Sequence, residues 1–508
     1  MVSMVMEEDA KDSHSSPCHA QLVNELPSVP MDKGRLPNPT TDFPAWYGEV
    51  VKQAGMAEHS LARGTMVAKP HGYGIWEFVQ RALDDRFKLT GHENVYFPLY
   101  FPEKLLAKEA EHVEGFAPEL AVITHAGGAK LEEPLVVRPT SEAIIWSTYA
   151  NWIQSYRDLP LLYNQWGNVV RWELRTRLFL RTSEFLWQEG HTAHSSADEA
   201  HEEALRMLEV YREVAEDVLA IPVLPGRKSD AEKFAGAVTT FTIEGLMRDG
   251  KALQCGTSHF LGQNFARAYD VTFLNQSGEL ELVWGTSWGA SWRLVGGIVM
   301  THGDERGLRL PPRVAPVQVV IVPIYRTEDQ RIEVLAVACK LRDALVDDGI
   351  RVRVDDRDQY RPGYKFSEWE LKGVPIRIEV GPKDVAADQV VTVDRLTGEK
   401  RQRSTAQAAT SMPAALDEVQ AGLHRSALAF REANTHTASS YADLRDGITD
   451  QAGLWVGPWC GDPGCEERVT ADTKATIRVL PLVPEDPGAP CLVCGESGTE
   501  RATWARAY

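Results

Sequence analysis

The sequence predicts a mixed α/β (α+β) fold, and three features support this class. Two runs rich in aromatic and β-branched residues, 163–174 and 182–191, flank an arginine-rich stretch and predict an antiparallel hairpin. Residues 198–220 have the apolar spacing of an amphipathic helix. After Pro311-Pro312, strand patterns alternate with helix patterns, which is typical of an α/β domain. The 508 residues are enough for about three domains.

The elements before the hairpin are a tail, two helices and a short strand. Residues 1–40 are rich in Ser, Pro, Asp and Glu without a period, so we expect a mobile tail. Residues 73–89 place apolar side chains on one helical face, and residues 94–98 predict a strand closed by proline. A second helix is predicted at 143–152, headed by the polar cluster 138–142, which has the composition of a helix cap.

The elements after the hairpin continue the mixed pattern. At the start of the 198–220 helix, Ser196 and Glu199 have the spacing of a capping box. Beyond the proline pair, strands are predicted at 317–322, 350–354 and 376–380, and helices at 328–346 and 414–433.

The charge balance and hydropathy narrow the class of protein. The net charge is −18, with 43% hydrophobic and 25% charged residues, as in ordinary globular proteins. The longest apolar runs are shorter than the roughly 18 residues of a membrane span, and Glu7, Glu8 and Asp9 occupy the place where a signal peptide is positive. We therefore expect a cytoplasmic protein without a membrane partner.

Taken alone, the acidic charge argues against a nucleic-acid partner, but the charge is unevenly distributed. Residues 1–50 hold three basic and eight acidic side chains, whereas residues 351–383 hold eight basic and six acidic ones. A locally basic path on an acidic protein is suited to reversible, salt-sensitive contact with a polyanion.

The predicted hairpin carries an unusual set of polar side chains. On a strand, Arg171 and Glu173 would share one face, and Phe185, Trp187 and Glu189 would share a face of the returning strand. Charges in a core cost several kcal/mol unless they are paired. The set therefore indicates a floor for a ligand that is both anionic and aromatic, such as a nucleotide. The alternative is a solvated lattice of salt bridges on an exposed sheet.

Two further clusters carry candidate site residues. Residues 289–293 open an apolar helix that runs to 302–304, and Arg293 near its N-terminus would attract phosphate. Residues 254–259 form a polar, glycine-bearing segment that includes His259, a residue type that is more often structural than catalytic in such a setting.

Four of the seven cysteines lie in the last fifty residues, and the odd total argues against a disulfide framework. They form two close pairs, Cys460 with Cys465 and Cys491 with Cys494. Two close pairs are compatible with a four-thiolate zinc site. The alternative is a set of buried apolar cysteines.

Together these segments resemble the class II aminoacyl-tRNA synthetases. Arg171-Trp172-Glu173 resembles motif 2, the helix and strand ending at Pro98 resemble motif 1, and 289–293 resembles motif 3. The longer strings at 138–142, 185–191, 256–259 and 302–304 resemble the prolyl-tRNA synthetases, in their archaeal and eukaryotic-like subtype, from about residue 42 to the end. The resemblance implies an antiparallel-sheet catalytic domain at 41–312, an α/β anticodon-binding domain at 313–430 and a small C-terminal α/β domain at 431–508.

The resemblance implies that L-proline and ATP form prolyl-adenylate and pyrophosphate, and that proline then passes to the 3′ end of proline tRNA. Magnesium would accompany ATP, and zinc would bind the four C-terminal cysteines. The implied catalytic residues are Arg171, Arg293 and Glu173. The implied proline site comprises Thr140, Glu142, Arg171, Trp187, Glu189, His191, Thr257 and His259. The implied ATP site comprises Arg171, Arg181, Thr182, Phe185, Gln254, Thr257, Ser291 and Arg293.

The resemblance also implies partners and a quaternary state. Phe366, Glu370, Arg377 and Lys383 match positions that contact the anticodon. Motif 1 of this class lies at a dimer interface, so a homodimer is implied. The end of the chain at Tyr508 is expected near the active site, as in the subtype.

The sequence departs from the family pattern at two positions and leaves other functions open. Trp292 replaces a small hydroxyl residue and is expected to crowd the nucleotide site or a neighbouring channel for the tRNA end. Cys255 replaces a loop glycine, with a milder expected effect. About 95 residues separate motifs 2 and 3, too few for an inserted editing domain, so we expect no proofreading in cis. The alternatives are a threonyl or glycyl synthetase, and a non-catalytic paralogue that would have lost arginines.

Overall fold

The computed structural model describes residues 34–109 and 120–508, so the expected tail at 1–40 lies almost wholly outside the described residues. The chain divides into two compact units. The larger unit comprises Arg35–Pro316, Glu370–Pro375 and Leu416–Tyr508, and the described part of the smaller unit is made chiefly of Val317–Trp369 and Ile376–Ala415.

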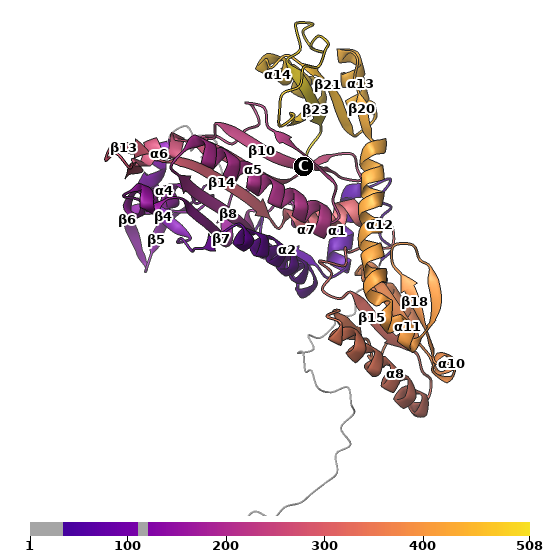
Figure 1. The fold of residues 1–508 in the computed structure, drawn as a ribbon. Coiled ribbons are helices and arrows are strands. Elements are labelled where there is room, and N and C mark those ends of the chain that lie inside the picture. The colour runs from indigo at the N-terminus through magenta and orange to yellow at the C-terminus, as the bar shows by residue number, and fades with distance from the viewer. Residues whose placement is uncertain (1–33, 110–119) are drawn as a thin grey trace, which may run out of the picture. The chain divides into compact units, whose positions relative to one another are not determined.

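A seven-stranded sheet forms the centre of the larger unit (Figure 1). In sheet order the strands are β3 (Glu93–Asn94), β7 (Leu161–Val170), β8 (Glu184–His194), β14 (Trp284–Ser291), β11 (Ala252–Gly262), β10 (Thr239–Leu246) and β9 (Val223–Arg227). Every neighbouring pair is antiparallel except β3 and β7. The predicted antiparallel hairpin is thus present as β7 and β8.

The hairpin strands end earlier than the sequence predicts. Val170 pairs with Glu184, and residues 171–183 form the connection, so Arg171 and Glu173 lie in a loop rather than on a strand. The loop turns inward because Leu178, Phe179 and Leu180 are buried in the main core. Their burial draws the arginine-rich segment back over the sheet and prevents further strand pairing.

Three other expectations about secondary structure are wrong. The expected strand at 94–98 pairs only at Glu93–Asn94, because the N–H of Phe97 donates to the side chain of Gln165 instead. Residues 289–291 belong to β14, so the apolar helix α7 (Arg293–His302) begins at Arg293. The polar segment 254–259 is not a loop but lies within β11.

Two predicted helices flank the sheet. Helix α2 (Pro70–Leu89) buries Ile75, Val79 and Leu83 on one face, as expected, and starts early because proline suits the first helical turn. Helix α5 (Ala197–Glu213) continues as a π-helical turn at Val214–Val218 and packs across β8, β14, β11 and β10 (Figure 1). The hydroxyl of Ser196 caps α5, but the Glu199 carboxylate accepts from Ser195, so half of the capping box forms.

The remaining elements within Arg35–Pro316 surround this sheet. They are α1 (Phe43–Gln53), β1 (Ala57–His59), β2 (Met66–Ala68), β4 (Tyr100–Pro102), η1 (Glu103–Glu109), β5 (Ala121–Ala126), β6 (Ala129–Val137), α4 (Glu142–Trp152), η3 (Tyr156–Asp158), α6 (Asn264–Tyr269), β12 (Thr272–Leu274) and β13 (Leu280–Leu282). Helix α4 matches the helix predicted at 143–152 within one residue.

The C-terminal part of the larger unit forms a four-stranded sheet and packs on the edge strand β9. Its elements are α12 (Met412–Ala433), β20 (Thr435–Thr437), α13 (Tyr441–Asp450), β21 (Leu454–Trp459), α14 (Pro463–Thr473), β22 (Thr476–Val479) and β23 (Glu500–Ala505). Arg227 and Leu480 exchange backbone hydrogen bonds of 2.8 and 2.9 Å. Gly226 permits this approach, since a Cβ there would lie 2.2 Å from the Leu480 carbonyl oxygen.

The smaller unit has the α/β organisation that the sequence predicts. Its sheet order is β16-β15-β17-β18-β19, with β15 parallel to both neighbours. Its elements are β15 (Val319–Pro323), α8 (Glu328–Asp347), β16 (Val352–Val354), α9 (Pro362–Leu371), β17 (Ile376–Val380), α10 (Pro382–Ala386), β18 (Gln389–Asp394), β19 (Lys400–Ser404) and α11 (Thr405–Thr410). The last two residues of α9, Glu370 and Leu371, belong to the larger unit. None of the helices within residues 34–109 and 120–508 has the length and apolar character needed to cross a bilayer.

Candidate active site

The largest group of predicted site residues lines one pocket of about 250 Å³ on the central sheet. Alternation along the strands explains this placement. Trp187, Glu189 and His191 of β8 face the pocket, whereas Gln188 points to the other face and contacts Tyr211 of α5. The pocket brings together twelve predicted residues: Thr140, Glu142, Arg171, Phe185, Trp187, Glu189, His191, Gln254, Thr257, His259, Ser291 and Arg293.

A second cavity of about 170 Å³ adjoins the first. It contains the predicted residues that the main pocket lacks, which are Glu173, Arg181 and Thr182. The two cavities share Arg171, Phe185, Ser291 and Arg293. Every predicted proline-site and ATP-site residue therefore borders one of these two adjoining cavities.

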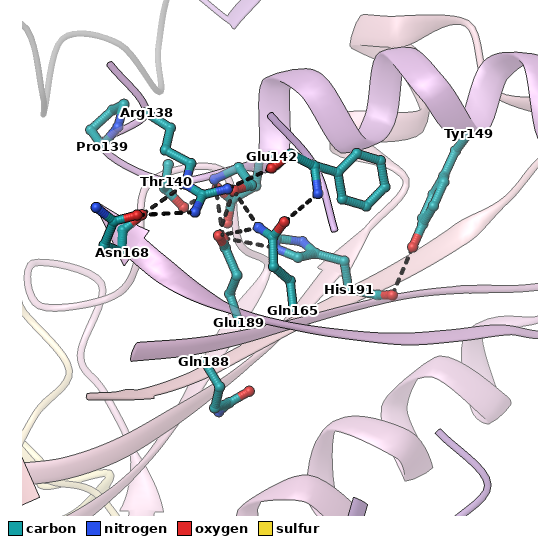
Figure 2. Close-up of polar contacts among 12 residues, drawn as sticks. Arg138, Pro139, Thr140, Glu142, Tyr149, Gln165, Asn168, Gln188, Glu189 and His191 are labelled. Atoms are coloured by element: carbon teal, nitrogen blue, oxygen red, sulfur yellow. Dashed lines mark hydrogen bonds and ion pairs between the residues drawn. The ribbon is translucent and has the colours of Figure 1, made fainter. Parts of the chain in front are cut away.

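Glu189 is the centre of a buried polar network at one end of the pocket (Figure 2). Its carboxylate accepts from the N–H of Ser141 at 3.0 Å, from the Ser141 hydroxyl and from the Gln165 amide at 3.0 Å, and lies 3.1 Å from His191 Nε2. Burial opposes the charge, but His191 and Ser141 hold the pKa of Glu189 below its usual range. The same contact with Glu189 raises the pKa of His191 despite its burial.

Thr140 and Glu142 lie beside this network at the start of α4. The Thr140 hydroxyl donates to the Glu142 carboxylate, which is buried. The cap interpretation of this cluster is wrong in one respect. Ser141 is the N-cap residue, but its hydroxyl binds Glu189 rather than the first turn of the helix. Ligand atoms of Glu142, Glu189 and His191 lie within 4.8 Å of one another, a spacing that suits a small cationic group.

Gln165 and Arg138 support the network, and neither was among the predicted site residues. Gln165 lies directly opposite Glu189 in the β7–β8 register, and its side chain also accepts from the N–H of Phe97. The buried Arg138 guanidinium donates to the carbonyls of Asn168 at 2.7 Å and Phe97 at 2.8 Å (Figure 2). The hairpin register is the signal that would have identified Gln165.

The other end of the site is rich in arginine. Arg171 donates to the carbonyl of Pro139 at 3.0 Å, and its guanidinium lies 5.5 Å from the ring of Phe185 and 5.4 Å from that of Trp187. The strand ends at Val170, but the N–H of Arg171 still donates to Ser183 at 2.8 Å. Arg171 therefore reaches the pocket from the first residue of the loop.

Arg181 and Arg293 complete the basic end. Arg181 pairs with Glu173 at 2.5 Å, and Arg293 donates to the carbonyl of Leu180 at 3.3 Å. Burial, followed by the charges of Arg171 and Arg181, lowers the pKa of Arg293. A bound anion would relieve this repulsion, so the three arginines favour a phosphate.

The two departures from the family pattern lie at the site but within the core. Trp292 is buried and packs edge-on to Phe179 at 5.8 Å, and it also borders the second cavity. Its bulk is therefore accommodated largely by the core rather than by the nucleotide site. Cys255 occupies a bulge of β11 opposite Ile243 and Glu244, where burial raises its pKa to about 12.

The end of the chain lies against the same sheet. The N–H of Tyr508 donates to the carbonyl of Ala252 on β11 at 3.1 Å, and its hydroxyl donates to Asp249 at 2.6 Å. The guanidinium of Arg177, in the arginine-rich loop, lies 5.7 Å from the Tyr508 ring. The chain end therefore contacts both the strand and the loop that supply the site.

The four C-terminal cysteines converge in space. Cys460 Sγ lies 3.7 Å from the sulfurs of both Cys465 and Cys494, and the four sulfurs, including that of Cys491, lie within 4.8 Å of one another. Four thiolates around a tetrahedral zinc ion, with Zn–S about 2.3 Å, are about 3.8 Å apart. The donor set therefore fits structural zinc.

Three of the predicted anticodon residues lie in the smaller unit. The Arg377 guanidinium lies 4.4 Å from the ring of Phe366 and pairs with Glu379 at 2.9 Å, and Lys383 is exposed on α10. The fourth, Glu370, belongs to the larger unit, where it pairs with Arg306 at 2.8 Å.

Comparisons with known proteins find related sequences across most of the chain. Family models described as "tRNA synthetase class II core domain (G, H, P, S and T)", "Anticodon binding domain" and "Prolyl-tRNA synthetase, C-terminal" match residues 127–302, 318–414 and 441–508, respectively.

Curated relatives match over most of the length of this chain. A protein named Proline–tRNA ligase from Amoebophilus asiaticus is 50% identical, covering 93% of this chain and 99% of the relative. Proteins of the same name from Chlorobium phaeobacteroides and Chloroflexus aurantiacus are each 52% identical, covering 92% and 94% of this chain and 98% and 100% of the relatives. These matches confirm the expected resemblance, and the chain belongs to the prolyl-tRNA synthetase family.

Proposed function

We propose that this protein is a proline–tRNA ligase that forms prolyl-adenylate from L-proline and ATP and then transfers the prolyl group to the 3′ end of proline tRNA. The observation that carries the proposal is the pair of adjoining cavities, of which the first is lined by buried carboxylates and the second by three arginines, two of them shared with the first. One end suits a secondary ammonium and the other suits phosphate.

Proline would bind at the carboxylate end. Thr140, Glu142, Glu189 and His191, with Thr257 and His259 from β11, would surround the ammonium and the ring. Trp187 offers an apolar wall for the ring methylenes. The buried and fully hydrogen-bonded Glu189 holds its charge without rearrangement, which favours a preorganised site.

ATP would bind at the arginine end. Phe185 and Arg293 would hold adenine between them, with Arg181, Thr182, Gln254, Thr257 and Ser291 around the nucleotide. Arg171 would contact the α-phosphate as the proline carboxylate attacks in line, and Glu173 would orient Arg181. Magnesium bound with ATP would draw charge from the departing pyrophosphate.

Proline-dependent exchange of labelled pyrophosphate into ATP tests this function. We expect exchange with proline and none with threonine or glycine. Exchange with another amino acid alone would identify a different class II synthetase, and absence of exchange with all amino acids would support a non-catalytic paralogue. Retention of Arg171, Arg181 and Arg293 in the site argues against the paralogue.

We also propose that the protein lacks an editing domain in cis. The described elements between β8 and β14 are α5, the π-helical turn, β9, β10, β11, α6, β12 and β13, all within the larger unit. They build the central sheet and its immediate cover, which leaves little chain for an inserted domain. Hydrolysis of alanyl-tRNA by the purified protein would contradict this proposal.

The remaining proposals concern tRNA, assembly and location. Phe366, Arg377 and Lys383, with Glu370, would contact the unstacked anticodon bases, for which aromatic and charged side chains are suited.

We propose a homodimer and a cytoplasmic location. Sedimentation showing an active monomer would exclude the dimer, and cell fractionation tests the location. We also propose that the three domains span residues 41–312, 313–430 and 431–508.

A further inference from the structure

Residues 228–234, which we call the pocket segment, border the candidate active site between β9 and β10. Glu232, Lys233 and Phe234 line the main pocket. The ring of Phe234 packs on that of His259 with centroids 4.6 Å apart, and the N–H of Phe234 donates to the Thr240 hydroxyl at 2.9 Å. The pocket segment therefore forms a wall at the end of the site where proline is proposed to bind.

Arg478 reaches the pocket segment from β22, in the C-terminal part of the larger unit. Its Nη1 donates to Glu232 at 3.0 Å, and its Nη2 donates to Glu244 at 3.0 Å. The Arg478 side chain is 9% exposed and that of Glu244 is 1% exposed. A guanidinium has a planar set of donors, so one arginine fixes both carboxylates relative to each other.

Lys228 closes this network. Its buried Nζ donates to Glu244 at 2.7 Å and to the backbone carbonyl of Arg478 at 3.1 Å. The two basic residues, Lys228 and Arg478, balance Glu232 and Glu244. Burial opposes ionisation of Glu244, but Lys228 and Arg478 hold its pKa below the usual range. The network is thus charge-balanced and mostly buried. Under these conditions, removal of one partner destabilises the protein strongly, because it leaves an uncompensated buried charge.

A second contact holds the start of the pocket segment. The Ser229 hydroxyl donates to Glu466 of α14 at 2.9 Å, and both residues are buried. The Ser229 carbonyl accepts from the N–H groups of Glu232 at 3.1 Å and Lys233 at 2.9 Å. A backbone turn therefore connects the anchored Ser229 to Glu232 and Lys233, which line the pocket.

We propose that Arg478 is a positioning residue for the amino-acid end of the active site. Through Glu232 and Glu244, it holds the pocket segment so that Phe234 packs on His259. The expected change in the KM for proline rests on the proposed function, because it assumes that proline is the substrate. The predicted nucleotide contacts Arg181, Thr182 and Arg293 lie at the other end of the site, so disruption should affect proline far more than ATP.

The test compares Glu232→Gln, Arg478→Met and Arg478→Lys in the full-length enzyme by pyrophosphate exchange. In Glu232→Gln and Arg478→Met, we expect the KM for proline to rise about tenfold or more and the KM for ATP to change less than about twofold. Arg478→Lys should recover part of the loss. Glu232→Gln combined with Arg478→Met should be no worse than Arg478→Met alone, because the two residues act through one contact.

Glu500→Gln is the matched control. Glu500 pairs with Arg227 at 2.5 Å and also joins the C-terminal part to β9, but it does not line the pocket. Its loss should leave the KM for proline unchanged. Unchanged proline KM in both Glu232→Gln and Arg478→Met, an equal rise in the KM for ATP, or the same rise in Glu500→Gln would overturn the proposal.

A substrate-free measurement separates this proposal from the proposed function. Amide hydrogen exchange of the 228–238 peptide should accelerate about tenfold in Glu232→Gln and Arg478→Met, but not in Glu500→Gln. Wild-type protein without proline-dependent pyrophosphate exchange would refute the proposed function, whereas unchanged amide exchange in both variants would refute positioning by Arg478.

Discussion

The Gln165 amide donates to Glu189 at 3.0 Å, directly across the β7–β8 pair. Because the second oxygen of Glu189 accepts from the Ser141 N–H at 3.0 Å, hydrogen-bond donors face both oxygens. A neutral amide in place of this carboxylate would turn an NH₂ group toward at least one of these donors.

Glu189→Gln should therefore impair proline activation strongly. Loss of a charge-assisted contact and an unsatisfied buried donor together cost about 3 kcal/mol, which corresponds to about a hundredfold loss in kcat/KM for proline. The measurement is pyrophosphate exchange at varied proline. Glu184→Gln is the matched control, because Glu184 is exposed at the start of the same strand. A Glu189→Gln enzyme within about threefold of wild type would contradict the assignment.

Arg171→Lys should lower kcat for adenylate formation more than it raises the KM for proline. Lysine keeps the charge but loses the planar donors that reach Pro139 and the stacking between Phe185 and Trp187. Loss of one preorganised donor at a developing charge typically costs about a hundredfold in rate. Single-turnover formation of prolyl-adenylate measures the effect. Arg175→Lys, at an exposed position of the same loop, should retain activity.

For strand β8, spacing was sufficient to predict which residues face the pocket, because side chains alternate along a strand. The other pocket residues followed only from the resemblance to the family. Spacing placed Phe185, Trp187 and Glu189 on one face correctly. It placed Arg171 and Glu173 on a strand incorrectly, because burial of residues 178–180 folds the loop inward, and an arginine-rich composition conceals that burial.

Spacing along the sequence does not predict contacts between distant parts of the chain. Gln165 has no local signal and acquires its role only from the hairpin register. Arg478 lies 246 residues after Glu232, so their contact depends on how the C-terminal part packs on β9. Trp292 was expected to crowd the nucleotide site, but the folded loop provides Phe179 as a packing partner.

The His191–Glu189 pair should make stability depend on pH. The raised pKa of His191 means that its contribution is complete below about pH 6.5, the unfolded value, and is lost as the pH rises through the folded pKa. The lowered pKa of Glu189 means that its contribution is present above about pH 4.3 and is lost on acidification. Glu142 is the other carboxylate whose charge acts on His191.

His191→Gln should therefore lower the thermal midpoint most near pH 6 and progressively less toward pH 9. His194→Gln serves as the control on the same strand, because burial lowers the pKa of His194 to about 4 and the ring stays neutral over this range. The thermal midpoint of wild type minus that of His194→Gln should not fall with pH: it should rise slightly between pH 6 and about pH 7.5, because the histidine is protonated only in the unfolded chain there, and then stay constant. A difference for His191→Gln that stays constant or rises with pH would show that the pKa of His191 is not raised in the folded protein.

The C-terminal cysteines should bind about one zinc ion per chain. Elemental analysis of Cys465→Ser should show loss of this zinc, whereas Cys255→Ser should retain it, because Cys255 lies on β11 outside the cluster. Zinc ligation should also protect the exposed Cys494 from alkylation until a chelator is added. Metal-free purified protein with all four thiols reactive would indicate that the cluster is not a zinc site.

Trp292→Ser should destabilise the protein and weaken ATP binding, although serine resembles the small residue usual in the family. Removal of a buried indole costs about 3–5 kcal/mol, and Phe179 would lose its edge-on partner 5.8 Å away. The loop that carries Arg181 would then be less well fixed, so the KM for ATP should rise while the KM for proline stays constant. Thermal melting and pyrophosphate exchange at varied ATP measure the two effects. Trp172→Ser, at a position 52% exposed in the same loop, should leave the thermal midpoint unchanged. A stable Trp292→Ser enzyme with a lower KM for ATP would show instead that the indole obstructs the nucleotide.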